Sequence, residues 1–119
     1  MPSSLNLFNK DSETIIINKA KNAIEENIQY IKVHESNVIE EMLRHLCELN
    51  IQSVLVEGGS KTLQSFIDAD LWDEARIITN EEMVLEEGII APQLKNRMPT
   101  LQEKYESDRI CYFYNYPVR

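Results

Sequence analysis

Two adjacent glycines mark the part of the sequence where chemistry is most plausible. Gly58 and Gly59 directly follow the apolar run Ser53–Glu57 and directly precede an amphipathic stretch. Free amides and the dipole at the start of a helix attract phosphate groups. Glycines let the backbone approach a ligand closely and adopt conformations that other residues resist. Further polar groups come from Ser60, Lys61 and Thr62. The pattern fits a phosphate site, and it fits equally a glycine turn that serves only tight packing.

The same stretch lacks the better-known phosphate-binding signatures. It has neither the G-x-x-x-x-G-K-[ST] spacing of nucleoside triphosphate loops nor the G-x-G-x-x-G dinucleotide pattern. Glu57 stands at the carboxyl end of an expected parallel strand, where open α/β sheets place their ligands. Its carboxylate could accept hydrogen bonds from an amine-bearing heterocycle. The alternative is that Glu57 caps the turn that follows it.

Apolar periodicity predicts the elements that position these residues. Short β-branched or apolar runs predict strands at Thr14–Asn18, Ile28–Val33, Ser53–Glu57 and Ala75–Thr79. Steps of three and four residues predict helices at Val38–Leu49, which Asn50 would end, and Lys61–Ala69. Residues 20–27 read as a loop or short turn, 81–94 as an acidic loop, and 100–105 with 109–116 as a hairpin. We expect one α/β domain over residues 1–119, with a mostly parallel sheet flanked by helices and a C-terminal β-hairpin.

Composition excludes several classes of function. The chain has 43% hydrophobic and 27% charged residues, as soluble globular proteins do, and its net charge is -8. Scattered basic residues on an acidic chain argue against nucleic-acid or anionic-membrane partners. No long apolar run or signal peptide is evident, so we expect a cytoplasmic protein. Cys47 and Cys111 are expected to be buried thiols, and His34 and His45 to be solvated, with no metal site.

A longer motif surrounds the glycine pair. Residues 53–76 read Ser-Val-Leu-Val-Glu-Gly-Gly-Ser-Lys-Thr-Leu-Gln-Ser-Phe-Ile-Asp-Ala-Asp-Leu-Trp-Asp-Glu-Ala-Arg. This run resembles the signature of the reductase (C-terminal) domain of the bacterial bifunctional riboflavin-biosynthesis deaminase–reductases. The segments Gly88–Pro92 and Pro2–Phe8 are also similar to that family, so the resemblance extends over essentially the whole chain.

The resemblance implies a dihydrofolate-reductase-like fold and an NADPH-dependent reduction. The substrate would be a pyrimidine ribose phosphate, 5-amino-6-(5-phosphoribosylamino)uracil, and the product its ribitylamino counterpart. By matching positions, Glu57 would contact the pyrimidine. The residues that would wrap the NADPH phosphates are Gly59, Ser60, Lys61, Thr62, Leu63, Gln64 and Ser65. No catalytic side chain is implied, because the cofactor provides the hydride.

The sequence also departs from the family pattern. The upstream Ser-x-Asp-Gly and Asp-Asn-Pro-x-Leu-Thr-x-Arg motifs are missing, as are the His-x-Glu and Pro-Cys-x-x-Cys motifs of the deaminase domain. The chain thus resembles a reductase domain truncated at its N-terminus. A lost neighbouring strand would expose backbone and apolar surface, so we expect a homo-oligomer. Two alternatives stay open: a non-catalytic nucleotide-binding or dimerising remnant, and a related dihydrofolate-reductase-like reductase.

Overall fold

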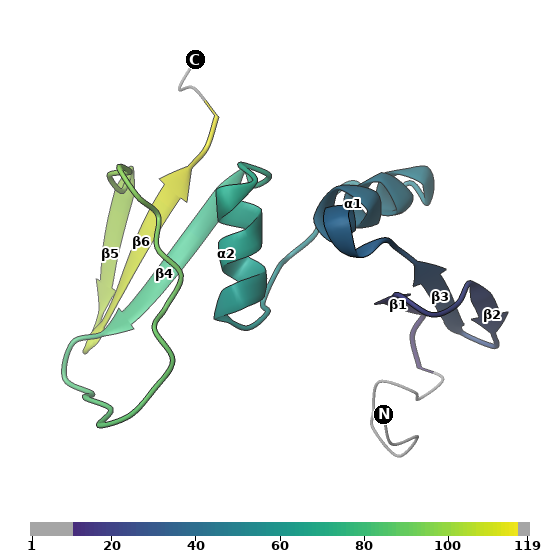
Figure 1. Ribbon diagram of the computed structural model, residues 1–119. Helices are drawn as coiled ribbons and strands as arrows, with labels where there is room; N and C mark the ends of the chain where they lie inside the picture. The colour runs from purple at the N-terminus through teal and green to yellow at the C-terminus, as the bar shows by residue number, and fades with distance from the viewer. Residues whose placement is uncertain (1–10, 117–119) are drawn as a thin grey trace. The chain divides into compact units, whose positions relative to one another are not determined.

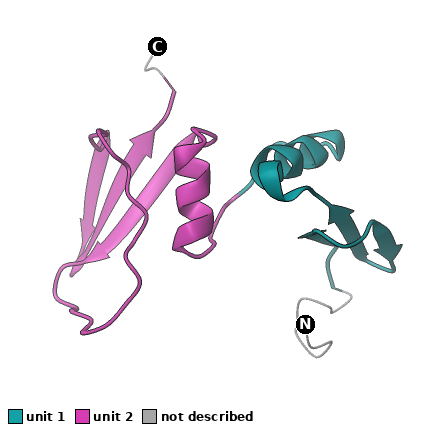
Figure 2. Ribbon diagram, in the orientation of Figure 1, with its two compact units in different colours: residues 1–54 teal, residues 55–119 magenta. Residues whose placement is uncertain are grey.

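A computed structural model describes residues 11–116, and the chain divides into two compact units between Val54 and Leu55 (Figure 2). Each unit holds a three-stranded sheet and one α-helix (Figure 1). The opening segment Pro2–Phe8, part of the family resemblance, lies outside the described residues. Within the described part of the chain, no helix is long and apolar enough to cross a membrane.

The first unit is built on a mixed sheet in the order β1-β3-β2. Its strands are β1 (Thr14–Asn18), β2 (Ala23–Glu25) and β3 (Ile28–Lys32), and β1 and β3 confirm two predicted strands. β3 pairs in parallel with β1 and antiparallel with β2. The stretch expected to be a loop thus contains β2. It forms because Glu26 takes a left-handed conformation (φ 53°) and closes a two-residue hairpin.

One helix, α1 (Val38–Glu48), follows the sheet after a short 3₁₀ turn, η2 (Glu35–Asn37). The helix confirms the prediction. Asn50, two residues after its last residue, has the left-handed conformation (φ 60°) expected of a stop residue. The buried apolar side chains of this unit are those of Ile28, Ile31 and Val33. The unit therefore has a small core centred on β3.

The start of α1 is held by Glu41, which accepts a hydrogen bond from the His34 amide at 3.0 Å. That bond keeps the pKa of Glu41 below its ordinary value of 4.5. A carboxyl group whose pKa is lowered by folding stabilises the folded state at pH values above its ordinary pKa. This contribution is lost as the pH falls through the lowered pKa. We therefore expect Glu41→Gln to lower the melting temperature at neutral pH but not well below pH 4.5. Melting curves of both proteins across this range test it; an equal difference at every pH would contradict it.

The second unit contains α2 (Ser60–Asp68), β4 (Glu74–Asn80), β5 (Leu101–Tyr105) and β6 (Asp108–Tyr114). Its sheet has the order β4-β6-β5 and is antiparallel throughout. The predicted helix, the predicted strand at 75–79 and the C-terminal hairpin are confirmed. The buried apolar side chains here are Phe66 of α2 and Phe113 of β6.

Residues 81–100 connect β4 to β5 without helix or strand, as the sequence predicts for 81–94. Asn80 fixes the start of this connection, since its side-chain oxygen accepts bonds from the amides of Glu82 and Met83. Further along, Gln93 exchanges backbone bonds with the Gln64 side chain of α2. The connection nevertheless leaves several large apolar side chains highly exposed: Met83, Val84, Leu85, Ile89, Ile90 and Met98.

The expectation of one mostly parallel sheet is wrong for the described residues, in which only β1 and β3 pair in parallel. The predicted strand Ser53–Glu57 is also absent, and its central residue Leu55 is 83% exposed. An apolar run becomes a buried strand only where neighbouring strands complete its hydrogen bonds and cover its side chains. Neither three-stranded sheet includes this run, so no neighbouring strand covers its apolar side chains.

Candidate functional site

The start of α2 forms a corner, residues 57–62, that offers unpaired backbone donors. Gly59 is the N-cap in an extended conformation (φ -60°, ψ 166°), and its carbonyl accepts the Leu63 amide at 3.2 Å. No side chain caps the helix. Within the described residues, the amides of Ser60, Lys61 and Thr62 consequently have no partner. Such amides, aligned with the helix dipole, are donors for an anion.

The two glycines serve different purposes, and neither has a positive φ. The expectation that they adopt conformations other residues resist is therefore not met. A Cβ added at Gly58 would lie 3.0 Å from the Cβ of Thr62 and 3.1 Å from its Cγ2, so the backbone at Gly58 approaches Thr62 closely. A Cβ added at Gly59 would meet nothing within 4 Å. Open space thus lies beside Gly59, at the end of the helix that carries the free amides.

This difference gives a test of the corner's packing. We expect Gly58→Ala to destabilise the protein by about 1–3 kcal/mol, the usual cost of overpacking, because Thr62 must move. Gly59→Ala meets no atom and should cost less than Gly58→Ala. Urea unfolding of the two variants measures the difference. Equal losses would contradict the steric role of Gly58.

The charges at the corner suit an anion beside a separate carboxylate. Lys61 is exposed in the first turn of α2, and that turn contains no acidic residue. Glu57 is exposed as well, and in the described structure it makes no hydrogen bond to the helix start. Capping, the alternative role for Glu57, is thus not observed. The exposed carboxylate of Glu57 therefore precedes the glycines, and the exposed Lys61 follows them beside the free amides.

The later residues of the predicted cofactor segment have other partners. Leu63 is half-buried, and the Ser65 hydroxyl donates to the Lys61 carbonyl at 2.8 Å. The Gln64 amide donates to Asp68 at 2.8 Å, and its oxygen accepts the Gln93 amide at 2.9 Å. Gly59, Ser60, Lys61 and Thr62 are therefore the open part of the predicted segment, whereas Leu63, Gln64 and Ser65 hold the helix together and anchor the 81–100 connection.

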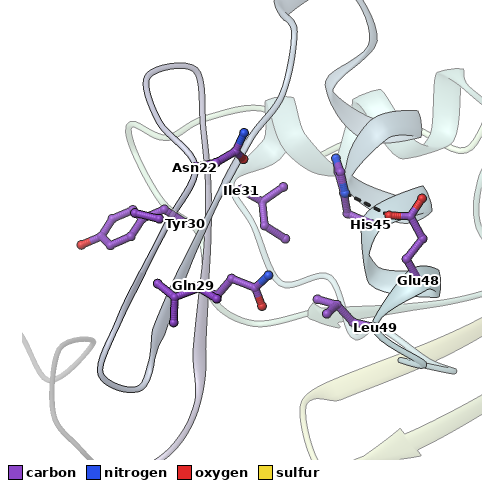
Figure 3. A pocket seen from close by; sticks show the side chains of 9 residues that line it. Asn22, Gln29, Tyr30, Ile31, His45, Glu48 and Leu49 are labelled. Atoms are coloured by element: carbon purple, nitrogen blue, oxygen red, sulfur yellow. Dashed lines mark ion pairs between the residues drawn. The ribbon is translucent and has the colours of Figure 1, made fainter.

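The first unit has its own pocket, of about 420 Å³, which sequence reasoning did not anticipate (Figure 3). Apolar and aromatic side chains of β2 and β3, and Leu49 just after α1, line it together with Asn22, Gln29, His45 and Glu48. His45 contacts Glu48 at 3.3 Å and is 27% exposed, so it is less solvated than predicted. Asn22 already accepts the Lys32 amide. With its polar groups partly paired and no cluster of free donors, the pocket is a weaker candidate than the corner.

Among the described residues, no group of three His, Cys, Asp or Glu side chains could hold a metal ion. Cys47 and Cys111 are free thiols, as expected. Burial of Cys47 was predicted wrongly, because it lies on the exposed side of α1, while Cys111 is half-buried.

The chain matches the family model described as the RibD C-terminal domain over residues 1–84. This region includes the whole motif at residues 53–76, with the corner and α2, and it also includes β4. It ends before the β5–β6 hairpin. No curated protein matches the chain. The match covers more than half of the sequence and confirms the resemblance carried by the Glu-Gly-Gly motif. The chain therefore belongs to the RibD C-terminal domain family, the NADPH-dependent pyrimidine reductases of riboflavin biosynthesis.

Proposed function

We propose that the chain forms part of an NADPH-dependent reductase that converts 5-amino-6-(5-phosphoribosylamino)uracil to its ribitylamino product. The observation that carries the proposal is the corner itself: three unpaired amides, the exposed Lys61 and the open space beside Gly59. These features fit a cofactor phosphate, since amides, helix dipole and a cation all favour an anion there. The family to which the chain belongs uses NADPH, and this supports NADPH as the cofactor in the proposal.

Each residue then has a limited physical task. NADPH, when bound, supplies the hydride, so the protein needs no nucleophile. The amides of Ser60, Lys61 and Thr62 hold the cofactor phosphates in place, and the Lys61 ammonium offsets their charge. Glu57 accepts hydrogen bonds from amine or ring N–H groups of the pyrimidine and so orients it. Leu63, Gln64 and Ser65 support the helix behind the site.

A backbone substitution tests the phosphate site directly. Ser60→Pro removes one amide donor at the first helical position, where proline is tolerated. The extended conformation of Gly59 is compatible with a following proline. Because hydrogen bonds to charged groups contribute about 1.5–3 kcal/mol, we expect NADPH affinity to fall at least about ten-fold while helix content is kept. The titration would follow quenching of Trp72 emission.

Ser60→Ala is the matched control, because it removes the hydroxyl and keeps the amide. It should weaken binding less than Ser60→Pro does. Unchanged affinity in Ser60→Pro, with the helix intact by circular dichroism, would refute the phosphate site at α2.

The second candidate function is a non-catalytic nucleotide-binding or dimerising remnant of the same domain. The exposed run Ser53–Glu57 favours it, because the carboxylate of Glu57 is not held by a surrounding sheet. The two functions differ in turnover. Oxidation of NADPH with the ribosylamino-pyrimidine as substrate supports the reductase, whereas NADPH binding without turnover supports the remnant. A third candidate, another dihydrofolate-reductase-like reductase, predicts turnover with a different pyrimidine or pterin.

The proposal extends to the fold. Residues 1–119 are proposed to be the C-terminal portion of a dihydrofolate-reductase-like domain. A homo-oligomer that covers the exposed run Ser53–Glu57 is part of the same proposal.

A further inference from the structure

The connection between β4 and β5 is held against α2 and the turn after it, all within the second unit. The Gln93 amide donates to the Gln64 side chain at 2.9 Å, and the Gln93 carbonyl accepts from the same side chain at 3.5 Å. Later in the connection, the Arg97 guanidinium lies 5.5 Å from the centre of the Trp72 ring and 3.8 Å from Asp70. From Gln93 onward, the connection therefore runs beside the helix toward the helix C-terminus.

The residues before Gln93 consequently lead toward the start of α2 (Figure 1). Because each helical residue rises about 1.5 Å, the helix begins about 6 Å before Gln64. An extended chain covers about 3.3 Å per residue, and Pro92 restricts the residue before it to extended conformations. About two residues thus bring the connection level with the first turn. The pair Ile89–Ile90 then reaches the end of the helix that carries the free amides.

This part of the connection has a different character from the rest. Gly88–Leu94 is its longest uncharged run, and it stands between Glu87 and Lys95. No part of the second unit covers Ile89 or Ile90, which are 89% and 79% exposed. An anion at the helix start would therefore have apolar side chains beside it and no carboxylate from this run. Apolar groups in that place can exclude water from a bound anion.

We propose that Ile89 and Ile90 bind NADPH beside its phosphates, and that Gln64 is the residue that positions them. The inference rests on the proposed function, because it requires the phosphates to lie on the amides at the start of α2. The two side chains then pack on the ribose groups that flank the phosphates and keep water from the amide–phosphate hydrogen bonds, which are stronger in a less polar environment. Gln64 acts through the connection, so it is a positioning residue and does not itself contact the cofactor.

Hydrogen exchange of the peptide that contains residues 89–91 tests whether the cofactor covers this segment. In the described structure these amides make no hydrogen bond, so we expect fast exchange in the cofactor-free chain. Saturating NADPH should slow that exchange by about ten-fold or more. Slow exchange without cofactor would show that another part of the protein covers the segment, and it would overturn the proposal. Exchange that NADPH leaves unchanged would overturn it as well.

Substitution tests the two side chains. The double variant Ile89→Ser, Ile90→Ser should bind NADPH about ten-fold more weakly, because two apolar contacts are lost. The matched control is Val84→Ser, Leu85→Ser, which changes two side chains of the same connection that are 86% and 73% exposed and lie outside the uncharged run. Its affinity should equal that of the wild type. An unchanged affinity in the isoleucine variant, or an equal loss in the control, would overturn the proposal.

A double-mutant cycle tests the positioning role of Gln64. Gln64→Ala removes both bonds to Gln93 and introduces a residue of high helix propensity. In the wild-type background it should weaken NADPH binding several-fold. In the isoleucine variant it should have little further effect, because the contacts that it positions are already gone. Additive losses would show that Gln64 does not act through the two isoleucines.

Failure of this proposal and failure of the proposed function give different results. If Ser60→Pro weakens NADPH binding and the isoleucine substitutions do not, the phosphate site stands and the contact with the connection is refuted. If the wild-type chain does not bind NADPH, both are refuted.

Discussion

Lys61→Glu should weaken NADPH binding by about ten-fold or more. The substitution replaces a cation at the start of α2 with an anion, next to the three amides that we propose hold the cofactor phosphates. The attraction of an anionic phosphate to the positive end of the helix dipole contributes on the order of 1 kcal/mol. A charge-assisted hydrogen bond from the Lys61 ammonium to that phosphate contributes on the order of 1 kcal/mol or more. Calorimetric titration of the variant with NADPH measures the effect. The loss should shrink in high salt, because salt screens exposed charges.

A charge-matched control separates local contact from long-range repulsion. Lys32→Glu changes the net charge by the same amount at an exposed position on β3, in the other unit. Its effect on NADPH affinity should be small. If Lys61→Glu and Lys32→Glu weaken binding equally, Lys61 is an ordinary surface charge and the phosphate contact is not made by its side chain.

Sequence reasoning succeeded where structure depends on near neighbours along the chain. The periodicity of α1 and α2 and the turn at Asn50 are local properties, and both helices begin within one residue of their predicted starts. The hairpin of β5 and β6 is likewise set by a short turn at Glu106, whose φ is 52°. Local propensity and turn chemistry are sufficient for such elements.

Prediction from the sequence failed where the structure depends on residues that are far apart in the chain. The apolar run at Ser53–Glu57 reads as a buried strand, but composition cannot show whether strands exist to pair with it. β4 was expected in a parallel sheet, yet it pairs antiparallel with β6, some thirty residues later in the chain. Whether a strand is parallel is a property of its partner, and apolar patterning alone does not encode it.

In the candidate site, too, the features set by adjacent residues were predicted and a contact between distant residues was not. The position of the glycine pair before α2 was predicted from adjacent residues, and the free amides follow from the helix start itself. The engagement of Gln64 with Gln93 joins residues that are 29 positions apart. Family resemblance assigned Gln64 to the cofactor because it matches a motif position, whereas the structure gives its side chain a supporting role that no local pattern reveals.

Phe66→Ala should destabilise the second unit by about 3–5 kcal/mol, the usual cost of truncating a buried phenylalanine. Phe66 is 6% exposed, and only one other apolar side chain in the described part of this unit, Phe113, is buried. A core this small has little redundancy, and a typical domain is stable by only about 5–15 kcal/mol. We therefore expect α2 to detach, which would also remove the helix start proposed to bind NADPH.

Hydrogen exchange measured by peptide separates this effect from general unfolding. In Phe66→Ala, amides of α2 should exchange faster, while those of β3 in the first unit should keep their wild-type protection. Ile78→Ala is the control, because Ile78 is 66% exposed in the same unit and its truncation removes little buried surface. If both variants changed exchange equally, Phe66 would not be the side chain that fixes α2, and the helix start would owe its position to the Gln64–Gln93 bonds instead.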